Sequence, residues 1–304
     1  TWGKEIDRYG QYPTSPPHNA PEHFQGRRRP IPNREDNPYV TAFWKWWPTL
    51  YKNLKHFRMT GGEPMMDKNT YKVFEYIIDN PKDDLHLNVT SNMCPPDNKL
   101  KEKYFNMAKR ICMEEKVEHM MQFVSVDAWG QRAEYIRDGL DFNYMMDNVE
   151  EFLDRIPSRN SITFICTYNN LSITSMDKLL EKVLELRAKY STTYQRIWFD
   201  VPLLRQPTWQ QITLLPESYQ IIHEENIEYM QKHCGNDRGY SKFNDFEIQK
   251  MQRNLAYWRE NADASTQNKK NFYAFFNEHD RRRLTRFLNT FPEMEEFWKE
   301  CMNA

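Results

Sequence analysis

Cysteine is scarce and scattered in this chain of 304 residues, long hydrophobic runs are absent, and neither sign of charge dominates. The cysteines are five in number and lie far apart, at Cys94, Cys112, Cys166, Cys234 and Cys301. An odd set at these spacings fits neither a disulfide framework nor a compact metal motif. No apolar run approaches the roughly 18 residues of a membrane span, and no signal peptide is visible. We therefore expect no membrane span and a reducing, cytoplasmic location.

The charges are balanced over the whole chain. Lysine and arginine number 42 and aspartate and glutamate 43, which gives a formal net charge of −1. This balance provides no overall attraction to nucleic acid or to an anionic membrane. Two arginine runs, at 27–29 and 281–283, are local exceptions. Runs of adjacent charges usually face solvent, so we expect exposed arginines there and no nucleic-acid partner.

Three segments of the chain differ in pattern. Residues 1–40 are rich in proline, arginine, asparagine and tyrosine without a sustained period, which predicts an irregular loop. Residues 41–205 alternate strand-sized apolar runs with helix-period segments. Residues 206–304 show helical periodicity only, and we expect a C-terminal helical extension there. The first residue is threonine rather than methionine, which we interpret as a sign of processing or of a fragment.

The middle segment contains five predicted strands, at 54–59, 85–90, 122–126, 162–167 and 196–201. Each except the last is followed by a helix-period segment, as expected of βαβ units and a parallel sheet. Five units are too few for a closed eight-stranded barrel. They suit an open or partial barrel, or a doubly wound sheet. In all of these α/β folds, ligands bind beyond the carboxyl ends of the strands.

The first predicted strand runs into Gly61, Gly62, Glu63 and Pro64. Two glycines allow the backbone to approach a ligand closely because they have no Cβ. The Glu63 carboxylate is an acceptor for an ammonium group, and Pro64 stiffens the exit of the turn. The competing interpretation is an ordinary strand-to-helix turn.

Polar side chains also follow two other predicted strands. The second strand ends in a group of short hydrogen-bonding side chains that includes Ser91 and Asn92. In the third, Ser125 and Asp127 are two residues apart, so strand alternation points them the same way. Arg137 follows shortly afterwards and offers a guanidinium for a carboxylate. Each of these groups also has an ordinary structural role, as a helix cap or in an ion pair.

In these motifs the chain resembles the radical S-adenosylmethionine (SAM) enzymes, over residues 43–202. The sequence TGGEP at 60–64 resembles the family's GGEP motif on the second barrel strand, which holds the amino group of SAM. The sequence VSVD at 124–127, followed by YIRDG at 135–139, resembles the family's SxD…R signature on the fourth strand. The segment NVTSN at 88–92 is similar to the third-strand segment near the same ligand. Residues after 272 are more loosely similar to tails described as a reduced twitch extension.

The resemblance implies a fold, a site and an activity. The fold is a partial (β/α)6-type parallel barrel that lacks its first strand and carries a C-terminal helical extension. Glu63 and the backbone of the two glycines would hold the ammonium of SAM, while Ser125 and Arg137 would contact its ribose and carboxylate. The implied activity is reductive cleavage of SAM to a 5′-deoxyadenosyl radical, which abstracts hydrogen from an unknown substrate, a peptide or a small metabolite. A [4Fe–4S] cluster and an electron donor are its other requirements.

One part of the family pattern is missing. The CxxxCxxC loop, whose thiolates hold the [4Fe–4S] cluster, is absent because no cysteine precedes Cys94. Either the sequence is truncated before its cluster loop, or the domain is degenerate and binds a ligand or partner without redox chemistry. In both cases we expect this chain alone to be inactive. Cys112 and Cys166 lie on apolar faces, and we expect them to be small buried side chains.

Overall fold

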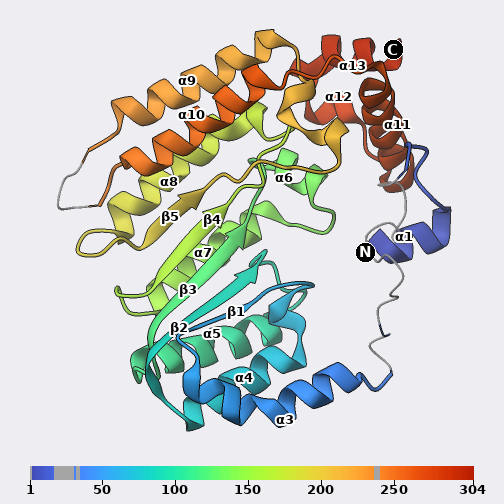
Figure 1. The fold of residues 1–304 in the computed structure, drawn as a ribbon. Coiled ribbons are helices and arrows are strands. Elements are labelled where there is room, and N and C mark those ends of the chain that lie inside the picture. The colour runs from blue at the N-terminus through green and yellow to red at the C-terminus, as the bar shows by residue number, and fades with distance from the viewer. Residues whose placement is uncertain (1, 17–30, 32–34, 236–239) are drawn as a thin grey trace.

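The structure is a computed structural model that describes residues 2–16, 31, 35–235 and 240–304. It has an α/β fold in which helices flank a parallel sheet and a group of helices follows the last strand (Figure 1). The arginine run at 27–29 and much of the segment expected to be an irregular loop lie outside the described residues. None of the described helices is both long and apolar enough to cross a membrane.

Five strands form the sheet, as predicted: β1 (His56–Met59), β2 (Lys82–Ser91), β3 (Val117–Ser125), β4 (Ser161–Ile165) and β5 (Ile197–Asp200). They are hydrogen-bonded in the order β1-β2-β3-β4-β5, and every neighbouring pair is parallel. A doubly wound sheet reverses its strand order at a switch point. This sheet does not reverse, so the doubly wound alternative is wrong.

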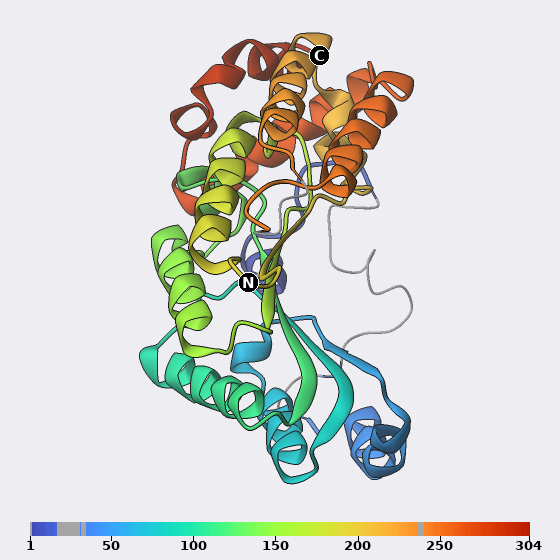
Figure 2. The ribbon, with the colours of Figure 1, turned by 90° about the vertical axis from the view of Figure 1, so that its left-hand side faces the viewer.

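Helices connect successive strands: α4 (Lys68–Asp79), α5 (Asn98–Met113), α6 (Gln131–Ile136), α7 (Phe142–Arg155) and α8 (Met176–Tyr190). Figure 2 shows α5, α7 and α8 along one side of the sheet. This is the result of right-handed crossovers between strands that are taken in order. Before β1 lies α3 (Pro38–Asn53), which begins with Asn37 as its N-cap.

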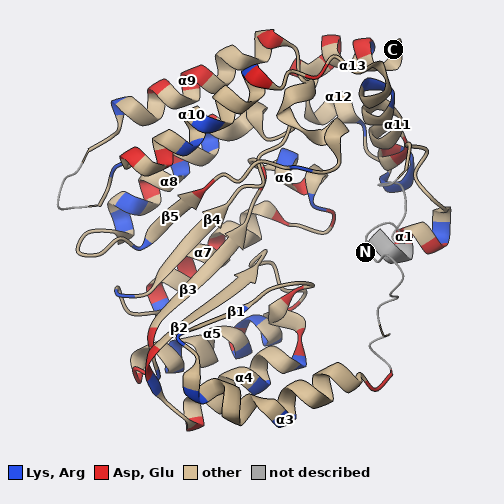
Figure 3. Cartoon of the chain, in the orientation of Figure 1, with Lys and Arg blue, Asp and Glu red and all other residues tan. Residues whose placement is uncertain are grey.

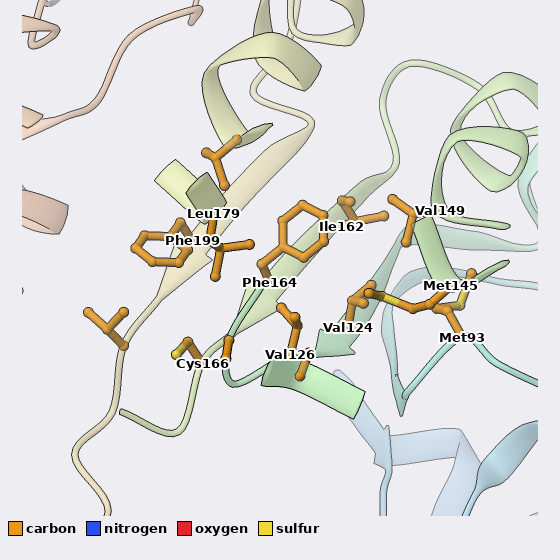
Figure 4. Packing of buried hydrophobic residues seen from close by; sticks show 14 of the residues in the cluster. Met93, Val124, Val126, Met145, Val149, Ile162, Phe164, Cys166, Leu179 and Phe199 are labelled. Atoms are coloured by element: carbon orange, nitrogen blue, oxygen red, sulfur yellow. The ribbon is translucent and has the colours of Figure 1, made fainter. Parts of the chain in front are cut away.

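The core lies between the helices and the covered face of the sheet. Figure 4 shows Val124, Ile162 and Phe164 of the strands beside Met145 and other side chains of the covering helices. All four are fully buried. Burying an aliphatic or aromatic side chain of this size contributes about 1.5–3 kcal/mol. This packing therefore stabilises the parallel sheet, whose strands all have their carboxyl ends at the same edge.

Over β1–β3, the other face of the sheet carries side chains that are exposed or half-exposed. We call it the open face, and it consists of His56, Arg58, His86, Asn88, Thr90, His119, Met121, Phe123 and Ser125. The faces of parallel sheets are usually both covered. Since the described residues leave this face of the sheet uncovered, it offers a surface for a ligand.

The expected C-terminal helical extension consists of α9 (Gln220–Lys232), α10 (Asp245–Glu260), α11 (Thr266–Arg283), α12 (Phe287–Thr290) and α13 (Glu295–Met302). A buried ion pair joins it to α8, because Arg187 Nη1 is 3.1 Å from Glu247 Oε2 of α10. Asn254 of α10 also donates to the backbone oxygen of Val201, just beyond β5, at 3.0 Å. In the view of Figure 3, charges of both signs are interspersed over these helices.

Residues 1–40 are not the uniform irregular loop that the composition predicts. They include helix α1 (Trp2–Tyr9), and α3 already begins at Pro38. Helix α1 is held by contacts with a distant segment: Arg283 Nη2 of α11 is 3.0 Å from Glu5 Oε2, and the Tyr12 hydroxyl donates to the same carboxylate. Such long-range contacts override a weak local pattern.

The arginine run at 281–283 is a further correction. We expected these side chains to face solvent, but the side chain of Arg282 is fully buried. Its Nε is 2.6 Å from Glu278 Oε1, and its Nη2 donates to the backbone oxygen of Gly10 at 3.0 Å. Its guanidinium lies 3.9 Å from the centre of the Tyr12 ring. Only Arg281 of the run is mainly exposed, at 59% of its side chain.

We predict that Arg282→Met lowers the free energy of unfolding by about 3–5 kcal/mol, because Glu278 keeps only its pair with the exposed Arg281 and the backbone oxygens of Gly10 and Gln11 lose their buried donor. Arg281→Met is the matched control, because it removes an exposed ion pair with the same Glu278, and we expect it to change stability by about 1 kcal/mol or less. Urea unfolding followed by circular dichroism measures both. Equal effects of the two substitutions would contradict the buried role of Arg282.

Candidate site at the strand ends

The turn after β1 depends on its two glycines for conformational reasons. Gly61 has φ +90° and Gly62 has φ +55°, a backbone region that L side chains rarely adopt. A Cβ on either residue would meet no protein atom within 4 Å. The described part of the chain therefore does not crowd these glycines, and it leaves the space beside them open to a ligand. Pro64 is buried and begins a short 3-10 turn, Pro64–Met66.

Glu63 links the turn after β1 to the end of β2. Its Oε1 accepts hydrogen bonds from Ser91 Oγ at 2.6 Å and from the backbone N–H of Met65 at 3.1 Å. Its Oε2 accepts one from the backbone N–H of Asn92 at 3.1 Å. An ionised carboxylate has about four acceptor positions. Three are used by the described residues, which leave one on Oε2 for a further donor.

At the end of β2, Ser91 contributes its side chain to the site, whereas Asn92 contributes only its backbone N–H. The side chain of Asn92 accepts from the backbone N–H of Cys94 at 3.0 Å, so it closes a turn rather than facing the Glu63 carboxylate. Ser91, which the sequence offers only as one of a group, is the side chain that binds Glu63. Strand alternation could have singled out Ser91 in the sequence. It places Ser91 on the same, buried side of β2 as Leu87 and Val89.

Asp127 and Arg137 form an ion pair beyond the end of β3. Arg137 Nη2 is 2.8 Å from Asp127 Oδ2, and Asp127 Oδ1 accepts from the backbone N–H of Thr167 at 2.9 Å. Burial raises the pKa of Asp127, while the charge of Arg137 and these hydrogen bonds oppose the rise. The pair therefore braces the ends of β3 and β4, and one donor of the guanidinium is already used.

Ser125 and Asp127 differ in surroundings, although alternation predicted that they point the same way. Ser125 is half-exposed on the open face, opposite Ile165, whereas Asp127 is buried. The reason is that β3 ends at Ser125, so strand alternation does not continue to Asp127. The Ser125 hydroxyl makes no hydrogen bond to the described part of the chain, and it is available to a ligand.

The predicted site residues therefore fall into two groups. Glu63 and the backbone of Asn92 lie together at the ends of β1 and β2, and Asp127 and Arg137 lie together at the ends of β3 and β4. Within the described residues, no hydrogen bond or ion pair joins the two groups. Because β2 and β3 are neighbours, both groups lie at the same edge of the sheet.

A small pocket of about 260 Å³ lies beside the turn. Its lining includes Thr60, Gly61 and Pro64 of the turn and Phe43 of α3. Pockets for drug-sized ligands usually measure about 300–1,000 Å³. This pocket is near the lower limit, so it fits a part of such a ligand.

The described residues do not fit an iron–sulfur cluster. Among residues 2–16, 31, 35–235 and 240–304, no group of three His, Cys, Asp or Glu side chains is placed to hold a metal ion. Cys112 and Cys166 are buried, which confirms our expectation for them. Cys94 contacts the backbone of Asp141, whose N–H is 3.5 Å from its sulfur.

We predict that Asp127→Asn lowers the free energy of unfolding by about 1.5–3 kcal/mol, the usual value of a hydrogen bond to a charged group. The amide oxygen still accepts from Thr167, while Arg137 loses its counter-charge. Chemical denaturation gives the value, and Asp147→Asn on the exposed side of α7 is the control. An unchanged midpoint for Asp127→Asn would show that the pair does not brace the strand ends.

Comparison with protein-family models, with curated proteins and with solved structures found no match to this chain. A functional conclusion therefore rests on its residues and their arrangement.

Proposed function

We propose that this chain binds SAM at the carboxyl ends of β1–β3, in a partial (β/α)6-type barrel of the radical SAM kind. The strand order supports this proposal, because a barrel wall has its strands in sequence order with helices on the outer side. The uncovered face of the sheet would then be the inside of the barrel. The resemblance of the motifs at 60–64 and 124–139 is the second support.

The observation that carries the proposal is the unused acceptor position of Glu63 beside an open glycine turn. The amino group of SAM is a cation with three donors, and a half-exposed carboxylate held by three hydrogen bonds is a prepared partner for it. The exposed backbone at Gly61 and Gly62 lies next to this carboxylate. No rearrangement of Glu63 is needed for an ammonium to bind.

The other predicted contacts are assigned as part of the same proposal. Ser125 has a free hydroxyl on the open face and would bind the ribose. Arg137 has donors left after its bond to Asp127 and would bind the carboxylate of SAM. A guanidinium fixed by a buried acid loses little freedom when it binds a second carboxylate, which favours this role.

When bound, SAM would supply a sulfonium whose reductive cleavage yields a carbon radical. The described residues hold no ligand set for the [4Fe–4S] cluster that this cleavage requires. We therefore propose binding and orientation of SAM for these residues and derive no redox step from them. The substrate, a peptide or small metabolite, and the electron donor belong to the same proposal for a complete enzyme.

The alternative is a binding module that holds a nucleoside or a partner without radical chemistry. The absence of cluster ligands among the described residues favours it. It predicts ligand binding that does not depend on iron.

We predict that Glu63→Gln weakens SAM binding about 10- to 100-fold, since a hydrogen bond to a charged group contributes about 1.5–3 kcal/mol. Isothermal titration calorimetry measures the affinity, and Glu225→Gln on the exposed side of α9 is the matched control. The substitution also disturbs the turn. The affinity for 5′-methylthioadenosine, which lacks the amino acid part of SAM, separates the two effects.

Loss of SAM affinity with unchanged affinity for 5′-methylthioadenosine is the expected result. An equal loss for both ligands would assign Glu63 to the structure of the turn only. No affinity of the wild-type chain for either ligand would overturn the proposed function.

We also predict that anaerobic incubation of this chain with iron and sulfide yields no stable [4Fe–4S] spectrum, because no three described cysteines lie close enough to ligate a cluster. Visible absorption and electron paramagnetic resonance would detect one. A stable cluster on the 304-residue chain would contradict this expectation.

A further inference from the structure

Three histidines stand in one row across the open face, at equivalent positions of adjacent strands. In the parallel register, His56 lies opposite His86 and His86 lies opposite His119. The rings of His56 and His86 are stacked with their centroids 4.7 Å apart, and those of His86 and His119 are 6.1 Å apart. His119 Nε2 is 3.0 Å from Ser161 Oγ of β4. We call these three side chains the histidine row.

A guanidinium without a carboxylate partner lies next to the row. Arg58 follows His56 by two residues in β1 and shares its face. Its Nε and Nη2 are 3.2 and 3.1 Å from Thr90 Oγ1, and its guanidinium lies 4.1 Å from the centre of the Phe123 ring. Neither partner carries a charge. Among the described residues, no carboxylate forms an ion pair with Arg58.

One carboxylate on β2, close in sequence to the row, is already paired with two cations. Asp84 precedes His86 by two residues in β2, and it pairs with both Lys55 and Lys82. Two cations thus surround one acid. The ion pairs hold its pKa at about 2, with the hydrogen bond to Lys55 as the largest cause. This acid therefore stays ionised, and the charges of Lys55 and Lys82 offset its attraction for protons.

Other groups act on His119 from the neighbouring segments. Burial lowers the pKa of His119, a charge on His86 lowers it further, and Glu118 and Arg159 oppose each other. Arg159 is itself paired with Glu115 at 3.1 Å. The charged groups named here are four cations, Lys55, Lys82, Arg58 and Arg159, and three carboxylates, Asp84, Glu115 and Glu118, so among these described residues the cations exceed the carboxylates by one.

The close spacing of the three imidazoles makes their protonation and the binding of an anion depend on each other. Protonated imidazoles at these distances repel one another. A doubly charged anion over the row offsets this repulsion and also meets the unpaired guanidinium of Arg58. The rings, which are half-exposed or exposed, present N–H donors to such an anion.

We infer that the histidine row and Arg58 form a binding site for the oxyanion group of a small molecule, a phosphate or sulfate group, which binds more tightly as the imidazoles take up protons. The histidine row lies along the open face and away from the strand ends, whereas Arg58 also lines the pocket beside the turn after β1 and so adjoins the proposed SAM site. The oxyanion site does not depend on the proposed function. Binding of SAM and binding of an oxyanion are measured separately, so either can fail alone.

Inorganic sulfate is the probe for this site, because its charge is constant across the range in which histidine titrates. Calorimetry at constant ionic strength, from about pH 7.5 to about pH 5.5, spans the usual histidine pKa of about 6.5. We expect the affinity for sulfate to rise at least about 10-fold over this range. By linkage, saturating sulfate should raise the pKa of the row's imidazoles, which NMR titration of the ring protons shows.

Two substitutions test the residues. His86→Phe keeps an aromatic ring in the stack but removes the titratable group, and Arg58→Met removes the guanidinium. We expect His86→Phe to reduce the pH dependence, because only His56 and His119 of the row remain titratable, and Arg58→Met to weaken sulfate binding about 10-fold. Arg253→Met is the matched control, because the Arg253 guanidinium also lies over a ring, that of Phe246 at 5.9 Å. It should leave sulfate binding unchanged.

Sulfate affinity that is equal at both pH values, or unchanged in His86→Phe, would overturn the inference. So would equal losses in Arg58→Met and Arg253→Met. Zn²⁺ binding that depends on His86, without any sulfate binding, would make the row a metal site and would also overturn it.

Discussion

The pairing of five parallel strands in their order along the chain is the constraint on which the rest of the structure depends. Parallel neighbours need a crossover for each connection, and right-handed crossovers between strands in order leave every helix on the same side. The apolar side chains then fill that side. The opposite face is left with histidine, arginine and aromatic side chains, and all carboxyl ends meet at one edge. This arrangement of the strands determines the positions of the turn at Gly61 and of the ion pair between Asp127 and Arg137.

The sequence predicted the strands and the following helices because their patterns are local. Alternation and helical spacing act over a few residues, so strong local patterns of this kind can be recognised without the tertiary structure. The limits of the strands were less predictable. β2 begins at Lys82, earlier than predicted, although Asp83 and Asp84 favour strands poorly. The backbone of Lys82 donates to Lys116 at 2.9 Å, and this pairing with the segment before β3 extends the strand.

The contacts that decide the site were not predictable in the same way. Arg137 was expected to face a ligand, but its first partner is Asp127, because the loop after β3 brings the two together in a buried place. The burial of Arg282 and the helix α1 depend on each other across the whole length of the chain. A local pattern contains no information about such pairs. Glu63 was correctly expected to be an acceptor, but its hydrogen bonds to Ser91 and Asn92 require the register of β1 and β2.

The buried pair of Arg187 and Glu247 has a consequence for how the molecule comes apart. The side chains are 0% and 2% exposed, and they join α8 of the sheet layer to α10 of the extension. Separating the two layers would leave an uncompensated charge in an apolar interior, which costs several kcal/mol. The sequence pattern changes near residue 205, but this position is therefore not a boundary between two parts that unfold independently. We expect the sheet and the helices that follow it to unfold as one cooperative unit.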